Sequence, residues 1–143
     1  MHAVGFFHEQ SRPDRDEHVT INLENVEKGM EDNFMKYALN EANMVGEYDM
    51  CSIMHYRVWD HGQSCTLHKL KSRNCTKCQC LESEKRGRML TVLPKHNRFE
   101  KYCNINEIGE RQNFTNEDIM KLNLLYDCDK EGMYILYTSN VIS

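Results

Sequence analysis

The segment HAVGFFHEQSRPDRD, residues 2–16, contains the spacing that decides how this chain folds. His2 and His8 stand six residues apart in it, with Gly5 midway. Six residues of a continuous helix advance by about 600°, so these imidazoles would point roughly 120° apart and could not share one metal ion. Because glycine readily takes a positive φ, Gly5 can end the helix and turn His8 back toward His2. We therefore expect the two histidines to meet, although an isolated pair of this kind also fits a helix end that faces solvent.

Two further stretches accompany this segment in the chain. SIMHY spans residues 52–56, and IGERQNFTNEDIMKLNLLYDC spans residues 108–128. Together the three stretches resemble the astacin family of zinc metalloendopeptidases: the second half of its signature HExxHxxGFxHExxRxDRD, its Met-turn, and the end of its catalytic domain. The positions that match the signature after His2 are Gly5, Phe6, His8, Glu9, Arg12, Asp14, Arg15 and Asp16.

The resemblance implies an α+β zincin-like (metzincin) fold. This chain would cover the end of the active-site helix and the C-terminal lobe, which we expect to be mostly helix and irregular loop. Residues 1–128 would form the C-terminal portion of an astacin-like peptidase domain, and residues 129–143 a short tail. The implied function is a zinc-dependent metalloendopeptidase that hydrolyses a protein or peptide substrate by metal-activated water, with one Zn²⁺ per complete domain.

The same resemblance implies a role for each matching residue. His2 and His8 would be zinc ligands, and Tyr56 would be an additional ligand that stabilises the oxyanion of the tetrahedral intermediate. Met54 would form the apolar floor under the metal, and Glu9 would anchor the amino terminus of the mature enzyme. We interpret the charged residues of the signature mainly as a turn with local ion pairs: Arg12, Asp14, Arg15 and Asp16.

The family signature also needs a histidine four residues before His2 and a glutamate three before it, whereas only Met1 precedes His2 here. Loss of that general base costs about 10²–10⁴ in rate, so we expect this chain by itself to be inactive and the complete protein to carry both residues upstream. The resemblance also implies that Cys128 pairs with an upstream cysteine. That leaves six cysteines whose pairing stays open: Cys51, Cys65, Cys75, Cys78, Cys80 and Cys103.

Residues 57–90 form a basic, cysteine-rich insertion relative to the family. Eight basic residues against three acidic ones give it a net charge of +5, which leaves −9 for the rest of the chain. Three interpretations stay open: a disulfide-linked surface loop, a loop that attracts an acidic partner, or a separate zinc site in which the CxxCxC motif at residues 75–80 is joined by His61 or His68. An alternative function follows, a non-catalytic secreted binding module that uses this basic loop.

Composition limits the remaining possibilities. The chain has 143 residues, 40% of them hydrophobic, and a net charge of −4, which indicates one globular domain and no nucleic-acid partner. Its apolar runs are about five residues long, far too short to span a membrane. Seven cysteines favour a secreted or extracellular protein, although this chain shows no signal peptide. Apart from the alternative zinc site in the insertion, the other histidines are interpreted as surface or packing residues: His18, His55, His61, His68 and His96.

Two helices are predicted from local patterns. The first spans Asn22 to Leu39, because apolar residues recur there at helical spacing: Leu23, Val26, Met30, Phe34 and Tyr37. The second begins with a capping box formed by Thr115 and Asp118. It places Ile119, Leu122 and Tyr126 on one face, and we expect it to pack beneath the Met-turn and to position Cys128 for its upstream partner.

Overall fold

The computed structural model describes residues 1–38, 44–64, 87–96, 103–105 and 107–128. Within them the order of elements is η1 His2–Val4, η2 Glu9–Ser11, η3 Arg15–Glu17, β1 Val19–Ile21, η4 Leu23–Asn25, η5 Glu31–Phe34, β2 Val92–Pro94 and α2 Asn116–Tyr126, where η denotes a 3₁₀ helix. The expectation of irregular loop is confirmed, whereas regular helix among the described residues is limited to α2 and is less than expected. No described helix is long and apolar enough to cross a membrane.

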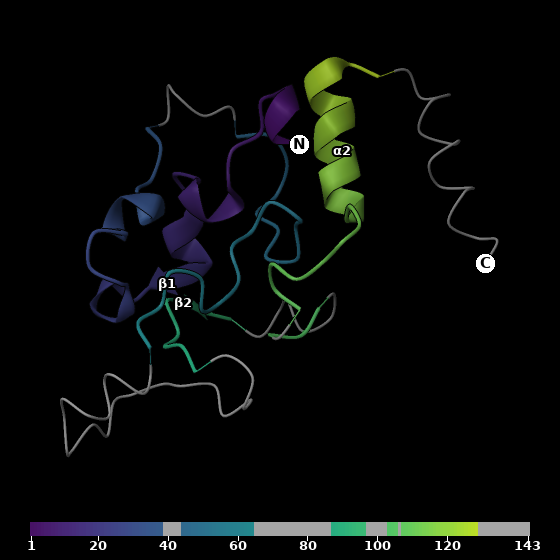
Figure 1. Ribbon diagram of the computed structural model, residues 1–143. Helices are drawn as coiled ribbons and strands as arrows, with labels where there is room; N and C mark the ends of the chain where they lie inside the picture. Colours follow the sequence, from purple (N-terminus) through teal and green to yellow (C-terminus); the bar gives the residue numbers. More distant parts are fainter. Residues whose placement is uncertain (39–43, 65–86, 97–102, 106, 129–143) are drawn as a thin grey trace, which may run out of the picture.

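A small antiparallel sheet joins the two halves of the described chain. β1 pairs with β2 in the register Val19↔Pro94, Thr20↔Leu93 and Ile21↔Val92 (Figure 1). Val19 and Val92 are fully buried, as expected of β-branched residues on the inner face of a two-stranded sheet. β1 precedes residues 57–90 in the chain, and β2 follows shortly after them. Residues 65–86 of that segment lie outside the described residues.

The predicted helix from Asn22 to Leu39 is wrong. The structure places two short 3₁₀ turns there, and Gly29 between them has a φ of 89°, a conformation that a right-handed helix does not contain. The apolar stripe is not buried as a unit, since Leu23 is 52% exposed and Met30 is 41% exposed. Only part of the pattern faces the core, namely Val26 and Phe34.

Long-range hydrogen bonds explain why this segment does not form a helix. The backbone N–H of Glu27 donates to the carbonyl of His61 at 2.8 Å, and the carbonyl of Asn25 accepts from Gln63 at 2.8 Å. The buried Asn25 amide also donates to the Leu90 carbonyl at 2.6 Å. These partners use backbone groups that a helix would pair locally, so tertiary contacts override the local periodicity.

A disulfide between Cys51 and Cys103 closes the core. It links the start of the Met-turn to the segment before α2, over a sequence separation of 52 residues. The buried hydrophobic residues around it are Val19, Val26, Phe34, Met50, Val58, Trp59, Leu90, Val92 and Ile108. Cys128 is a free, exposed thiol, and its predicted upstream pairing stays a prediction. The cysteines of the insertion, at positions 65, 75, 78 and 80, lie outside the described residues.

The capping box of α2 is confirmed. The Thr115 hydroxyl accepts from the Asp118 N–H at 2.9 Å, and the Asp118 carboxylate accepts from the Thr115 N–H at 3.0 Å. The predicted apolar face is only partly correct, because Tyr126 is 55% exposed, whereas two charged residues of α2, Asp118 and Lys121, are buried. This buried polar face was not predicted, although the spacing of three residues was a sign that both side chains lie on one side of the helix.

Candidate metal centre

The N-terminal turn brings the two signature histidines together. η1 ends at Gly5, whose φ is 89° and whose N–H donates to the His2 carbonyl at 3.0 Å, while the Phe6 N–H reaches the Met1 carbonyl at 3.4 Å. This left-handed cap is the geometry that glycine favours. The rings of His2 and His8 then lie 4.6 Å apart between centroids. The prediction that Gly5 adopts a positive φ and turns His8 toward His2 is confirmed.

Both imidazoles are oriented by backbone carbonyls. Nδ1 of His2 lies 2.9 Å from the Phe6 oxygen, and Nδ1 of His8 lies 3.1 Å from the Met54 oxygen. A carbonyl oxygen only accepts, so each Nδ1 carries the proton and donates it. Each Nε2 is left with its lone pair, which is the tautomer that a metal-binding histidine requires.

Tyr56 completes the group on the side of His8. Its ring lies 4.4 Å from the His8 ring and 5.4 Å from the His61 ring, centroid to centroid, and its backbone N–H donates to the buried Gln10 side chain at 3.1 Å. Burial, together with the neighbouring His2 and His61, lowers the pKa of His8. Burial and the charge of Asp60 raise the pKa of Tyr56, so the neutral forms of both rings are favoured.

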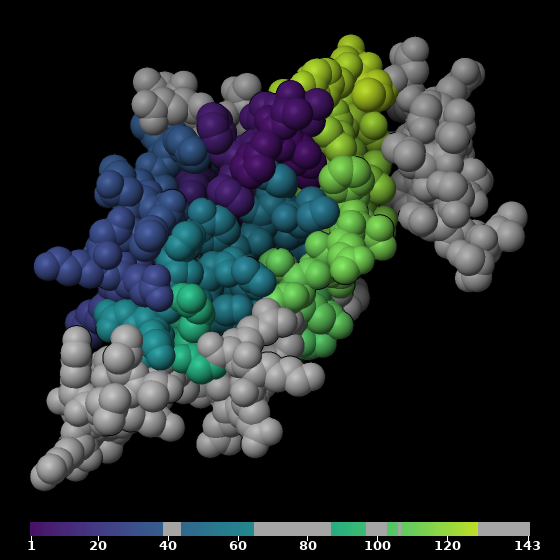
Figure 2. All heavy atoms as spheres, in the orientation of Figure 1, coloured from purple at the N-terminus to yellow at the C-terminus, as the bar shows by residue number. Residues whose placement is uncertain are grey.

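The Met-turn holds this arrangement from below. The carbonyl of Met54 accepts both the Glu9 N–H at 3.0 Å and the His8 ring N–H at 3.1 Å, which fixes the N-terminal segment on the turn. The Met54 side chain is buried. The backbone N–H of Met54 donates to the Ser52 hydroxyl at 3.0 Å. Figure 2 shows the N-terminal segment in the upper part of this face, beside α2.

Asp118 ties α2 to the Met-turn. Its carboxylate accepts from the Ser52 hydroxyl at 2.5 Å and from the Ile53 N–H at 3.1 Å, in addition to capping α2 through Thr115. The side chain is completely buried, and a buried carboxylate is stable only when its oxygens are paired in this way. The expectation that this helix packs against the Met-turn is confirmed.

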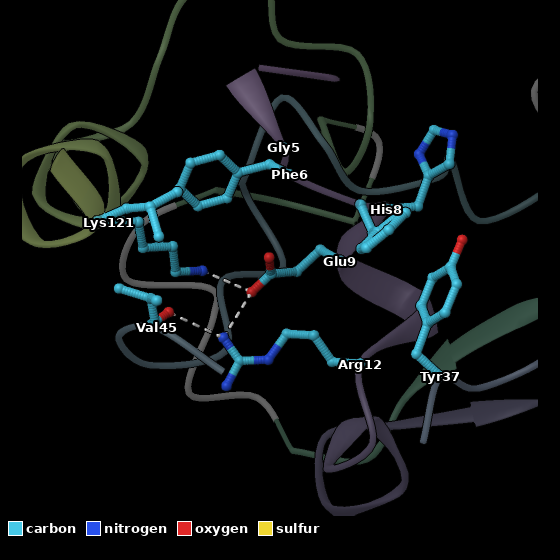
Figure 3. Close-up of a pocket in the computed structure, with 10 residues that line it drawn as sticks. Gly5, Phe6, His8, Glu9, Arg12, Tyr37, Val45 and Lys121 are labelled. Carbon is cyan, nitrogen blue, oxygen red and sulfur yellow. Dashed lines mark hydrogen bonds and ion pairs between the residues drawn. The ribbon is translucent and has the colours of Figure 1, made fainter. Parts of the chain in front are cut away.

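Glu9 lies in a buried charge cluster immediately after His8. One of its oxygens, Oε1, lies 2.6 Å from the Lys121 ammonium and 3.4 Å from the Arg12 guanidinium, and it accepts the Asp49 N–H at 2.9 Å (Figure 3). Burial raises the pKa of Glu9, and Lys121 partly offsets this effect. The cluster borders a pocket of about 120 Å³ that also touches His8. The part that Lys121 plays in it was not predicted from the sequence.

The charged residues of the signature form the predicted turn. Arg12 binds the Asp14 carboxylate through two nitrogens at 2.9 and 2.7 Å, and Arg15 contacts Asp16 at 3.2 Å. Arg12 also reaches the carbonyl oxygens of residues 45–47. Arg15 is buried, and its guanidinium donates to the Gln10 carbonyl at 2.9 Å. Both arginines therefore bind backbone carbonyls in addition to forming local ion pairs.

His55 is a buried member of the Met-turn. Its Nδ1 donates to the Tyr56 carbonyl at 2.6 Å, and its Nε2 accepts from the Tyr48 hydroxyl at 2.9 Å. Burial lowers its pKa to about 4. The interpretation of His55 as a packing residue is therefore confirmed, and its two hydrogen bonds link the backbone of Tyr56 to Tyr48.

The donors gathered here fit part of a zinc site. Among the residues that the structure describes, no group of three or more histidine, cysteine, aspartate or glutamate side chains is placed to hold a metal ion. Two imidazoles with available Nε2 atoms and one phenol are present instead. Zinc accepts imidazole readily, and catalytic zinc sites use three protein ligands plus water. The chemistry of the donors suits zinc, and one strong ligand is lacking among the described residues.

Comparisons with known proteins identify the family that this chain resembles. Residues 1–81 match the family model of the Astacin peptidases. Zinc metalloproteinase nas-13 of Caenorhabditis elegans is 42% identical over 129 residues, which cover 90% of this chain and 22% of that relative. Tolloid-like protein 1 of Homo sapiens is 57% identical over 56 residues, which cover 38% of this chain and 6% of that relative.

A solved structure shares the fold. High choriolytic enzyme 1, a hatching enzyme zinc-protease from the medaka fish Oryzias latipes, matches with a TM-score of 0.58 and 31% identity, over 87% of this chain and 48% of that chain. The chain spans a minor part of its curated relatives: 22% of nas-13, 18% of nas-15 and 32% of nas-4.

Proposed function

Because this chain belongs to the astacin family of peptidases, we propose that it supplies the lower half of the active site of a zinc-dependent metalloendopeptidase. The observation that carries the proposal is the adjacent pair of imidazoles of His2 and His8, whose ring centroids lie 4.6 Å apart, each with its Nδ1 proton held by a backbone carbonyl. His2, His8 and Tyr56 would hold the zinc ion. Residues 1–128 would belong to the peptidase domain, with the basic insertion at about 57–90 and the short tail at 129–143.

The residues of this chain have separate tasks in that proposal. Bound zinc would supply Lewis acidity toward a peptide carbonyl and lower the pKa of water. The carbonyls of Phe6 and Met54 orient the two imidazoles, while the Tyr56 phenol would donate to the substrate oxygen as negative charge develops on it. Met54 forms part of the apolar support under the site. The substrate would be a protein or peptide, and the single described disulfide supports action in a secreted or extracellular setting.

The chain by itself is proposed to be inactive. Only Met1 precedes His2, so this chain carries neither the glutamate base nor the additional histidine of the family signature. The loss of a general base costs about 10²–10⁴ in rate. Glu9 does not replace the base, because its Oε1 is engaged by Lys121, Arg12 and the Asp49 N–H. We propose instead that Glu9 anchors the amino terminus of the mature enzyme, since it borders the pocket beside His8.

Zinc content and peptidase activity, measured together, test this function. We expect this chain to bind zinc weakly and to cleave no peptide, and a longer chain that restores the histidine and glutamate ahead of His2 to bind about one zinc per protein and to cleave. His8→Ala is expected to abolish zinc binding by the longer chain, whereas His96→Ala, at an exposed position, serves as the matched control. Absence of zinc from both chains would refute the proposal.

The alternative of a non-catalytic binding module makes a different prediction. Tight zinc binding by this chain that survives His2→Ala and His8→Ala together would place the metal in the cysteine-rich insertion. As a separate test of the binding module, an acidic partner is expected to bind the basic loop at residues 57–90, and that binding is expected to weaken with salt.

A further inference from the structure

A second pocket, of about 380 Å³, opens directly beside the candidate metal centre. Its walls include the candidate ligands His8 and Tyr56 together with residues of η5 and the segment that follows it, notably Asp32, Lys36 and Tyr37. The size falls within the range of about 300–1,000 Å³ that is typical of ligand pockets. A peptide bound across His8 and Tyr56 would therefore place one of its side chains in this pocket.

Two charged side chains, Asp32 and Lys36, line the pocket. The Lys36 ammonium is held in an ion pair 2.6 Å from the Asp16 carboxylate, which Arg15 also contacts at 3.2 Å. The other acid of η5, Glu31, accepts the Gly29 N–H at 2.7 Å. Asp32 is exposed, and within the part of the chain that the structure describes no cation or N–H group is recorded against its carboxylate. Among the described residues of the pocket wall, Lys36 is therefore held in an ion pair, whereas the Asp32 carboxylate is available to a ligand.

The remaining walls suit a long side chain. Tyr37 and Tyr56 contribute two aromatic rings, and Figure 3 shows Tyr37 beside His8. Met35, which is 65% exposed, adds a flexible apolar surface. Arginine and lysine combine an apolar stem with a cationic head, and such a head gains from the face of an aromatic ring as well as from a carboxylate.

We propose that this pocket binds a basic side chain, arginine or lysine, of a peptide substrate, and that Asp32 determines this preference. The proposal rests on the proposed peptidase function, because it places the peptide across His8 and Tyr56. It goes further in naming the substrate class and a residue that selects it.

Matched peptides test the preference without requiring catalysis. We would measure binding of three fluorescently labelled, end-blocked alanine pentapeptides, with arginine, glutamate or norleucine at the centre, to this chain in the presence of zinc by anisotropy. The arginine peptide is expected to bind about three- to tenfold more tightly than the norleucine peptide, the gain typical of an exposed ion pair with an added cation–π contact. Asp32→Asn is expected to remove most of that difference, because only the cation–π contact would remain, and Asp32→Lys to transfer the preference to the glutamate peptide.

The control variant is Glu24→Lys, which makes the same charge change at an exposed acid on η4 and is expected to leave the order of the peptides unchanged. Equal binding of the three peptides, no binding of any, or an arginine preference that survives Asp32→Asn would overturn the proposal. Zinc binding is measured separately on the same samples, so a chain that binds zinc but shows no arginine preference refutes the pocket assignment alone. An arginine preference in this chain, together with absence of zinc from both this chain and the longer chain, refutes the proposed metal function alone.

Discussion

Lys121 places its ammonium 2.6 Å from a carboxylate oxygen of Glu9, although 112 residues separate the two in sequence. Both side chains are buried, with exposures of 3% and 8%. The pair joins α2 to the segment that carries His8, so the far end of the chain helps to position the candidate metal centre. Removing one partner of a buried ion pair leaves the other charge uncompensated in a poorly solvated site.

We therefore expect Lys121→Met to lower the free energy of unfolding by about 3–5 kcal/mol, as judged by urea denaturation at pH 7. The double variant Glu9→Gln with Lys121→Met removes both charges and is expected to recover a substantial part of that loss. A single-variant cost below about 1 kcal/mol would show that the pair is not buried in solution, because exposed pairs are worth that little.

Asp118→Ala tests the link between α2 and the Met-turn. The substitution removes a helix cap and the acceptor for the Ser52 hydroxyl and the Ile53 N–H. We expect a loss of about 3 kcal/mol in the free energy of unfolding, which combines the cap and the buried hydrogen bonds. Asn116→Ala, at the exposed first residue of α2, is the matched control and is expected to change stability by less than about 0.5 kcal/mol.

His55 is expected to make stability depend on pH. Its pKa is lowered from 6.5 to about 4 by burial, so the unfolded chain binds a proton in a pH range where the folded chain does not. The contribution of His55 to the free energy of unfolding is therefore complete above pH 6.5. It is lost as the pH falls toward about 4, by a total of about 3 kcal/mol.

The pH effect is measured by urea denaturation from about pH 7.5 to about pH 4.5, a range that spans most of this titration. His8 also has a lowered pKa and contributes a slope of the same sign, so the informative quantity is the difference between the wild type and His55→Gln. A variant with the same slope as the wild type would contradict the assignment to His55.

The Cys51–Cys103 disulfide closes a long loop, and its removal is expected to destabilise the fold by about 4 kcal/mol. We would compare thermal unfolding of the variant carrying Cys51→Ala and Cys103→Ala with that of Cys128→Ser. The latter changes an exposed free thiol and is expected to have almost no effect. A large effect of Cys128→Ser would show that this residue has a structural partner.

Thiol titration under denaturing, non-reducing conditions distinguishes the interpretations of the basic insertion. We expect one free thiol per chain, that of Cys128, if the insertion cysteines pair with one another. Four or more free thiols would instead favour a zinc cluster built on the CxxCxC motif at residues 75–80.

Local conformation near the candidate metal centre could be predicted from the sequence because it depends on neighbouring residues. A positive φ at Gly5 follows from the absence of a side chain and from the spacing of the two histidines. The cap formed by Thr115 and Asp118 likewise needs only residues three positions apart. Both are confirmed in the structure.

The segment from residue 22 to residue 38 shows why the rest could not be predicted. Its apolar spacing favours a helix, but its backbone groups pair with His61 and Gln63, and the Asn25 amide pairs with Leu90. Those partners lie far along the chain, and no local pattern indicates them. The same holds for the pairing of β1 with β2, which joins residues more than seventy positions apart.

The sequence by itself predicted the family and the approach of His2 to His8, because these depend on short motifs with fixed spacing, and the zinc ligands that it suggests stay a proposal. Only the tertiary structure decided that Lys121 neutralises Glu9, that Asp118 supports the Met-turn, and that Asp32 lies in a pocket beside Tyr56. The physical reason is that a charged side chain is buried only where distant parts of the chain supply its partners. Those partners come together only in the folded chain, so the sequence alone does not identify them.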